Sequence, residues 1–135
     1  MRILNLSLAI LALMAAAPLS AKPAGLTVRA GESWAFSLFR GQPVNARKVR
    51  AGAQPGPGQI HVTVRTLMGT TMSISSANDI AYTYQAELIG VDRPVTVRSC
   101  TLPANGRVSF EHWPEIADAV RLSNFKPAPK GGACP

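Results

Sequence analysis

Residues 80–88 alternate apolar and polar side chains more regularly than any other stretch of the chain. Successive side chains point to opposite faces of a β-strand, so this period of two predicts a half-buried strand. One face of the strand rests on a core and the other meets solvent. A lone strand is not stable in water, so the stretch requires further strands to pack around it. Its core-facing set is Ile80, Tyr82, Tyr84, Ala86 and Leu88.

The rest of the chain consists of short apolar runs separated by turn signals roughly every 8–12 residues, with no long helical pattern. This spacing predicts an all-β fold, an antiparallel β-sandwich that is immunoglobulin-like in outline rather than a barrel. The cysteine pattern of true immunoglobulin domains is absent, because Cys100 has no upstream partner. The expected strands are residues 26–30, 33–39, 44–51, 60–68, 72–75, 80–88, 95–102, 107–112 and 119–125.

Local signals near the end of the chain add detail to this prediction. The Asn105-Gly106 pair accepts the positive φ angles of a type I′ turn and predicts a hairpin between the two strands that flank it. In the returning strand we expect Val108 and Phe110 to face the core and Glu111 to face solvent. The segment after this strand is compatible with a single helical turn.

Residues 1–21 have the layout of a secretory signal peptide. Arg2 gives a positive start, an apolar run follows, and Ala21 is a small residue at the expected cleavage point. An uncleaved membrane anchor is disfavoured, because the run is shorter than the roughly 20 residues that span a bilayer. A second cleavage position, after Ala17, is followed directly by proline. We therefore expect a periplasmic or secreted protein whose mature part, residues 22–135, is one domain without a transmembrane segment.

The chain has two cysteines, Cys100 and Cys134. Exported chains meet an oxidising compartment, so an even count predicts a disulfide bond. In the chain-entropy model, closing a loop of about 35 residues contributes roughly 4 kcal/mol to stability. The bond would also hold the proline- and glycine-rich C-terminal tail. The alternative, a redox or metal-binding pair, is disfavoured because neither residue lies in a C-x-x-C motif.

The densest cluster of positive charge comprises Arg40, Arg47, Lys48 and Arg50, and the whole chain has a formal net charge of +7. Charge on both faces of a strand is typical of a sheet edge, where it prevents edge-to-edge association. Two interpretations stay open: a solvated edge, or a surface that contacts an anionic partner such as a glycan, a lipid headgroup or an acidic protein. Nucleic acid is disfavoured, because Phe39 is the only aromatic residue close by.

No pattern of residues indicates catalysis, a metal site or a cofactor. The histidines, His61 and His112, are isolated from an obvious nucleophile, and no Gly-x-Ser-x-Gly motif is present. Glu111 and Glu115 do not form a recognised ligand or glycosidase pair. We therefore expect a protein without enzymatic activity, metal or cofactor.

The tryptophans have different expected roles. Trp34 shares one face of its strand with Phe36 and Leu38, which predicts a place in the core. Trp113 precedes a proline at the end of a strand. Two roles are open for Trp113: it caps the end of the sandwich, or it is exposed as a ligand-binding residue.

Four segments resemble small exported bacterial proteins that have no assigned activity. They are residues 82–88 (YTYQAEL), 100–106 (CTLPANG), 111–114 (EHWP) and 120–125 (VRLSNF). The resemblance as a whole covers roughly residues 59–125. The resemblance implies an exported sandwich and assigns no functional residue.

We therefore expect a non-enzymatic binding or accessory domain of the cell envelope that contacts an anionic component or a protein partner through its basic edge strand. The alternative is a small periplasmic hydrolase or a hydrolase inhibitor. An inhibitor would use a protruding loop, for which residues 52–58 are the candidate. A hydrolase would instead join a histidine to a carboxylate in a cleft.

Overall fold

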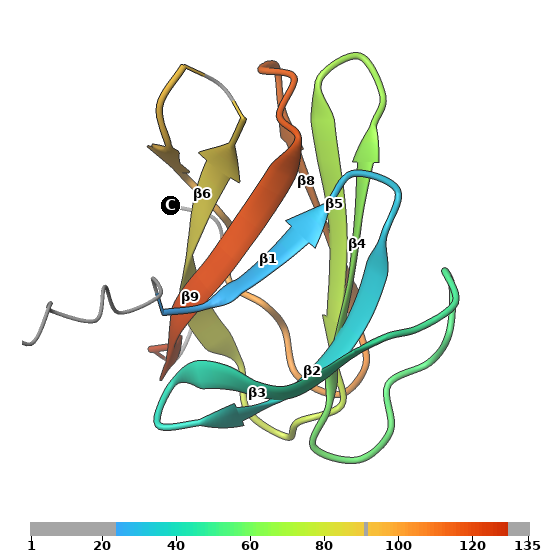
Figure 1. Cartoon of the computed structure of the whole chain (residues 1–135). Helices are drawn as coiled ribbons and strands as arrows, with labels where there is room; N and C mark the ends of the chain where they lie inside the picture. Colours follow the sequence, from blue (N-terminus) through green and yellow to red (C-terminus); the bar gives the residue numbers. More distant parts are fainter. Residues whose placement is uncertain (1–23, 91, 130–135) are drawn as a thin grey trace, which may run out of the picture.

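The computed structural model describes residues 24–90 and 92–129, which form two antiparallel β-sheets packed face to face (Figure 1). The four-stranded sheet has the order β1-β9-β6-β7, and the five-stranded sheet has the order β3-β2-β4-β5-β8. The predicted all-β sandwich is therefore confirmed. The strands are β1 (Leu26–Arg29), β2 (Ser33–Phe39), β3 (Gln42–Lys48), β4 (Ile60–Thr66), β5 (Thr70–Ser76), β6 (Tyr82–Ile89), β7 (Val95–Val97), β8 (Val108–Trp113) and β9 (Ala119–Pro127).

Strand β6 corresponds to the regular alternation at residues 80–88. Tyr84, Ala86 and Leu88 are buried, as the period of two predicts, whereas Ile80 lies before the strand and is 44% exposed. Strand β6 pairs with β9 on one side and with the short β7 on the other. It is thus an interior strand of its sheet, with its apolar face against the core.

The core is formed by apolar side chains from both sheets. Phe125 of β9 joins them: its ring stacks on Tyr84 at 5.3 Å between centroids and meets Phe36 of the opposite sheet edge-on at 5.7 Å. Aromatic pairs at these separations contribute about 0.5–1.5 kcal/mol each beyond the area they bury. Phe125 therefore links the two sheets near the β2–β3 turn, where its backbone NH donates to the carbonyl of Gly41 at 2.8 Å.

The predicted hairpin at Asn105-Gly106 is wrong. Both residues have positive φ angles, 62° and 80°, as the pair predicts. However, β7 before the turn pairs with β6, whereas β8 after it pairs with β5 of the other sheet. The turn is held by the chain beside it, since the backbone NH of Gly106 donates to the carbonyl of Ser76 at 2.6 Å. The segment is therefore a crossing between sheets.

The predicted facing of β8 is also wrong. Val108 and Phe110 are 52% and 71% exposed, whereas Glu111 and Trp113 are 8% and 7% exposed. Both buried polar groups have partners: the Glu111 carboxylate accepts the backbone NH of Cys100 at 2.6 Å, and Trp113 Nε1 donates to the carbonyl of Arg98 at 2.9 Å. Because side chains alternate, burying the large indole of Trp113 places Glu111 inside and Phe110 outside.

No helical turn follows β8. Pro114 and Glu115 form a bend, and the hydroxyl of the buried Thr70 holds it. This hydroxyl donates to the carbonyl of Glu115 at 2.8 Å and accepts the NH of Ala117 at 2.9 Å. Backbone groups that a helix would have paired are thus satisfied by one side chain of β5.

Some predictions fall on residues that the structure does not describe. The signal peptide at residues 1–21 and Cys134 lie outside the described residues, so the cleavage and the bond between Cys100 and Cys134 stay predictions. Within residues 24–90 and 92–129, no helix is long and apolar enough to cross a membrane.

Candidate binding surfaces

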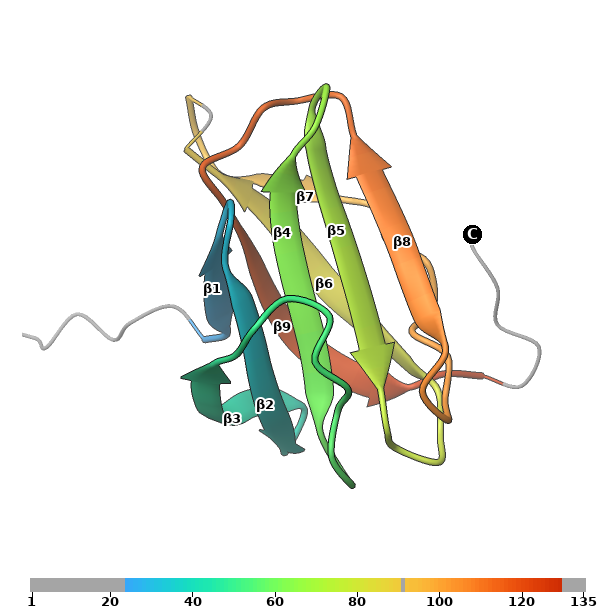
Figure 2. The same ribbon diagram turned by 90° about the vertical axis from the view of Figure 1, so that its right-hand side faces the viewer.

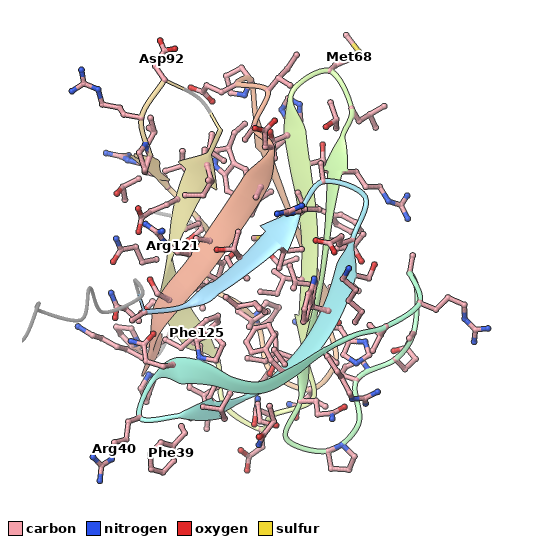
Figure 3. The ribbon with its side chains drawn as sticks, in the orientation of Figure 1. Phe39, Arg40, Met68, Asp92, Arg121 and Phe125 are labelled. Carbon is pink, nitrogen blue, oxygen red and sulfur yellow. The ribbon has the colours of Figure 1, made fainter. Side chains whose placement is uncertain are left out.

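The predicted basic edge strand is confirmed as an edge: β3 pairs only with β2 in the five-stranded sheet. Arg47, Lys48, Arg40 and Arg50 are all exposed. Arg40 lies at the turn between β2 and β3, where Figure 3 shows it beside Phe39 at one corner of the molecule. Its guanidinium carbon is 5.2 Å from the centre of the Phe39 ring.

The structure divides this basic cluster. Arg47 lies opposite Ala35, and Lys48 lies opposite Trp34, so the two side chains belong to opposite faces of the sheet. Arg40 is at the other end of the hairpin, about 20 Å along the strand at about 3.3 Å per residue. Among the three arginines of the cluster, Arg47 and Arg50 are the nearest to each other along the chain, three residues apart.

Lys48 already has a partner within the chain. Its ammonium lies 2.7 Å from the Glu32 carboxylate and 5.9 Å from the centre of the Trp34 ring. The hydrogen bond from Lys48 lowers the pKa of Glu32 below its ordinary value. Among the described residues, the only other ion pair joins Arg121 to Glu87. In that part of the chain, Arg40, Arg47 and Arg50 thus have no carboxylate partner.

Trp113 is not placed to contact a ligand. Its indole is 7% exposed and its nitrogen donates to the Arg98 carbonyl. This geometry fits the other expected role, in which the side chain caps the end of the sandwich. Trp34 of β2 is half-buried and packs against the core, with the Lys48 ammonium 5.9 Å from the centre of its ring.

The outer face of the five-stranded sheet carries a groove that sequence analysis did not predict. Figure 2 views this face, on which β4, β5 and β8 lie side by side. Register places Ser33, Thr63, Ser73 and Phe110 in one row across four strands. The main part of the groove has a volume of about 350 Å³, and a smaller pocket of about 100 Å³ adjoins it.

One wall of the groove is the segment between β3 and β4, which crosses in front of β4 (Figure 2). His61 of β4 holds this segment, because its Nδ1 lies 2.7 Å from the carbonyl oxygen of Ala53. A hydrogen bond there requires the proton on Nδ1, which leaves Nε2 as the acceptor in the neutral ring. Gly52 then lies over the groove. The expected loop at residues 52–58 is thus confirmed, and it is tied to the sheet at Ala53.

The other wall consists of exposed apolar side chains. Val108 and Phe110 of β8 stand on one side, and Leu67 of the β4–β5 turn, 66% exposed, closes one end. Arg65 is the only charged side chain among the described residues that line the groove. Met68, which follows Leu67 with a φ of 51°, points away at the tip of the turn (Figure 3). In the sequence, the adjacent apolar residues Leu67 and Met68 at the tip of an expected hairpin indicate exposed apolar surface at this end of the groove.

The two histidines do not come together. His61 lies opposite Ser75, whereas His112 lies opposite Thr71 and has Nε2 3.0 Å from the carbonyl of Met68. No group of three histidine, cysteine, aspartate or glutamate side chains that could hold a metal ion occurs within the described residues. The main part of the groove is lined by hydroxyl, apolar and guanidinium groups, and the His61 imidazole lines the adjoining pocket.

No family model, no curated protein and no solved structure matches this chain. The resemblance to small exported bacterial proteins stays a prediction. The function of the chain is therefore inferred from the geometry of its two candidate surfaces, the β3 edge and the groove.

Proposed function

We propose that this chain is a non-enzymatic, exported binding domain of the cell envelope, and that the β3 edge contacts an anionic partner. One observation carries the proposal: Arg47 and Arg50 are exposed and have no carboxylate partner among the described residues. Arg40, at the far end of the hairpin, provides a second contact point for an extended partner.

The physical basis is the chemistry of arginine. A guanidinium stays charged at every physiological pH and offers a planar fork of donors that matches carboxylate, sulfate or phosphate oxygens. The formal net charge of +7 attracts anions to the surface in general. The unpaired arginines would form the specific contact. Lys48 contributes less, because binding an external anion would compete with Glu32.

The geometry of the described residues gives the alternative function less support. Both imidazoles are next to backbone carbonyls, and no carboxylate lines the groove. A hydrolase would need an imidazole beside a nucleophile or a carboxylate. A protruding inhibitory loop would be free of the sheet, whereas Ala53 is tied to His61.

The test is binding of the purified protein to a panel of anions: a sulfated polysaccharide, polyphosphate and vesicles with anionic lipid. We expect saturable binding that weakens as salt is raised, because exposed charges are screened. The double substitution Arg47→Ala/Arg50→Ala should weaken binding by an order of magnitude, about the effect of losing one or two charge-assisted hydrogen bonds.

The matched control is Arg29→Ala/Lys126→Ala, which removes the same charge from exposed positions on the four-stranded sheet. An equal loss of binding in both double variants would show that net charge alone acts, and would contradict the proposed edge. Lys48→Ala should have a smaller effect than either arginine substitution.

A further inference from the structure

Strand β8 is arranged at some energetic cost. It leaves the phenyl ring of Phe110 71% exposed while it buries the carboxylate of Glu111. Val108 and Leu67 add exposed apolar surface to the same side of the sheet, against the same groove. A contiguous apolar patch on an otherwise polar face commonly marks a binding site.

The floor of the groove is made of hydroxyl groups. Thr63 and Ser73 lie between Gly52 and Phe110, with Thr71 in the next row. Thr63 Oγ1 is 2.7 Å from Ser33 Oγ, whereas within the described residues the hydroxyls of Ser73 and Thr71 have no protein partner. A ligand that covers these hydroxyls must itself hydrogen-bond to them, because each hydroxyl left buried and unpaired weakens binding.

The charge in the groove has one sign. Arg65 lies opposite Thr71, at the Leu67 end of the groove, and no carboxylate lines the groove among the described residues. A neutral ligand would leave this guanidinium without a counter-charge. An anionic group on the ligand would pair with it through two parallel hydrogen bonds.

These three features select among ligand classes. A fatty acid would meet Phe110 and Arg65 but would leave the hydroxyls of Ser73 and Thr71 covered and unpaired. An extended peptide would add to the free edge of β8 rather than lie across the strands. Single-stranded nucleic acid would need several aromatic platforms, and Phe110 is the only aromatic side chain among the described residues that line the groove.

We propose that the groove binds an acidic oligosaccharide, with the apolar face of one sugar ring on Phe110 and a uronic-acid carboxylate on Arg65. A pyranose ring combines what the surface requires. Its hydroxyls both donate and accept hydrogen bonds, and its partly positive C–H groups pack on the negative face of a phenyl ring. The inference goes beyond the proposed β3 contact, because it places an anionic ligand on a second surface and uses none of the β3 arginines.

The experiment is calorimetric titration with tetragalacturonate and with its neutral methyl ester, at moderate salt so that distant charges are screened. The unmodified protein should bind the acid more tightly than the ester. Phe110→Ala should weaken binding of both by about fivefold to tenfold, the size of one aromatic contact. Arg65→Ala should remove the preference for the acid and leave binding of the ester unchanged.

Ile116→Ala is the matched control, because Ile116 is 68% exposed and does not line the groove. It should leave both affinities unchanged. All variants change exposed side chains, so unchanged thermal unfolding should show that each one folds.

The outcomes separate this inference from the proposed function. If Arg47→Ala/Arg50→Ala abolishes binding of tetragalacturonate while Phe110→Ala does not, the edge is the contact and the groove inference is wrong. The inference is also overturned if the unmodified protein fails to bind tetragalacturonate but binds the other anions, or if decanoate binds as tightly and depends on Phe110. Binding that depends on Phe110 and Arg65 but not on the β3 arginines supports the groove and leaves the edge without support.

Discussion

Strands β6 and β8 each alternate between two sets of side chains, but they obey different rules. In β6 the set with Tyr84 and Leu88 is apolar and mostly buried, and the opposite set is polar except for Ile89 at the end of the strand. In β8 each set mixes apolar with polar residues, and the fold buries Glu111 with Trp113 while exposing Phe110. In the interior strand β6, the alternation of apolar and polar residues decides which face is buried. In the edge strand β8, the face that is buried is the one whose largest side chain fills the end of the core.

The position of the two strands explains the difference. Strand β6 has partners on both sides, and its inner face lies opposite the other sheet. Strand β8 has one partner, β5, and its inner face meets the segment after β7, which supplies the Cys100 NH and the Arg98 carbonyl. Backbone groups at this boundary make a buried carboxylate and indole nitrogen tolerable. The strand's apolar residues are then left for the outer face.

The largest expected effect is a loss of unfolding free energy in the interior strand β6, compared with the edge strand β8. Leu88→Ala removes a fully buried side chain of β6, and such truncations cost about 2–5 kcal/mol of unfolding free energy. Val108→Ala shortens an exposed side chain of β8 and should change stability by less than about 0.5 kcal/mol. Urea unfolding followed by fluorescence measures both. Similar losses from the two substitutions would show that the outer face of β8 is packed against something.

A middle-sized effect is expected at Glu111. Glu111→Ala leaves the backbone NH of Cys100 without its acceptor and should cost about 1–3 kcal/mol. Glu111→Gln keeps a side-chain oxygen at the same place and should recover most of that loss. His112→Ala, on the exposed set of the same strand, is the control. If denaturant unfolding finds His112→Ala as harmful as Glu111→Ala, the inverted facing of β8 is incorrect.

The substitution Tyr84→Phe is expected to have the smallest effect on the unfolding free energy at neutral pH and a distinct effect at high pH. Burial, together with the nearby negative charge of Glu111, raises the pKa of Tyr84 well above its ordinary value of about 10. The unfolded chain therefore releases this proton first, so stability is constant below about pH 10 and falls as pH rises above it. Tyr84→Phe should remove this part of the alkaline loss.

The measurement is the unfolding free energy of both proteins across the alkaline range. The absorbance change of tyrosinate provides an independent check, since the Tyr84 contribution should appear only on unfolding. A Tyr84 that ionises in the folded protein near its ordinary pKa of about 10 would show that the side chain is not buried in the core.

Much of the architecture could be predicted from local pattern. The alternation at residues 80–88, the charge on both faces of β3 and the turn spacing together predicted an antiparallel sandwich with a basic edge. These features are local, because a strand's periodicity and a turn's backbone angles depend on a few neighbouring residues. Of the basic edge, the sequence predicted the residues but not that Lys48 pairs with Glu32 on the opposite face from Arg47.

Two features were decided only by tertiary structure. Asn105 and Gly106 adopt the backbone angles that their types prefer, yet the turn joins different sheets, because strand pairing depends on partners distant in sequence. The groove likewise depends on long-range register, which places Thr63, Ser73 and Phe110 in one row. The sequence by itself therefore determined the class of fold and the approximate place of each strand, although the predicted strand at 95–102 is only Val95–Val97. The packing of Trp113 at the end of the core decided which side chains β8 presents to a ligand, since a strand can bury only one of its two faces against that core.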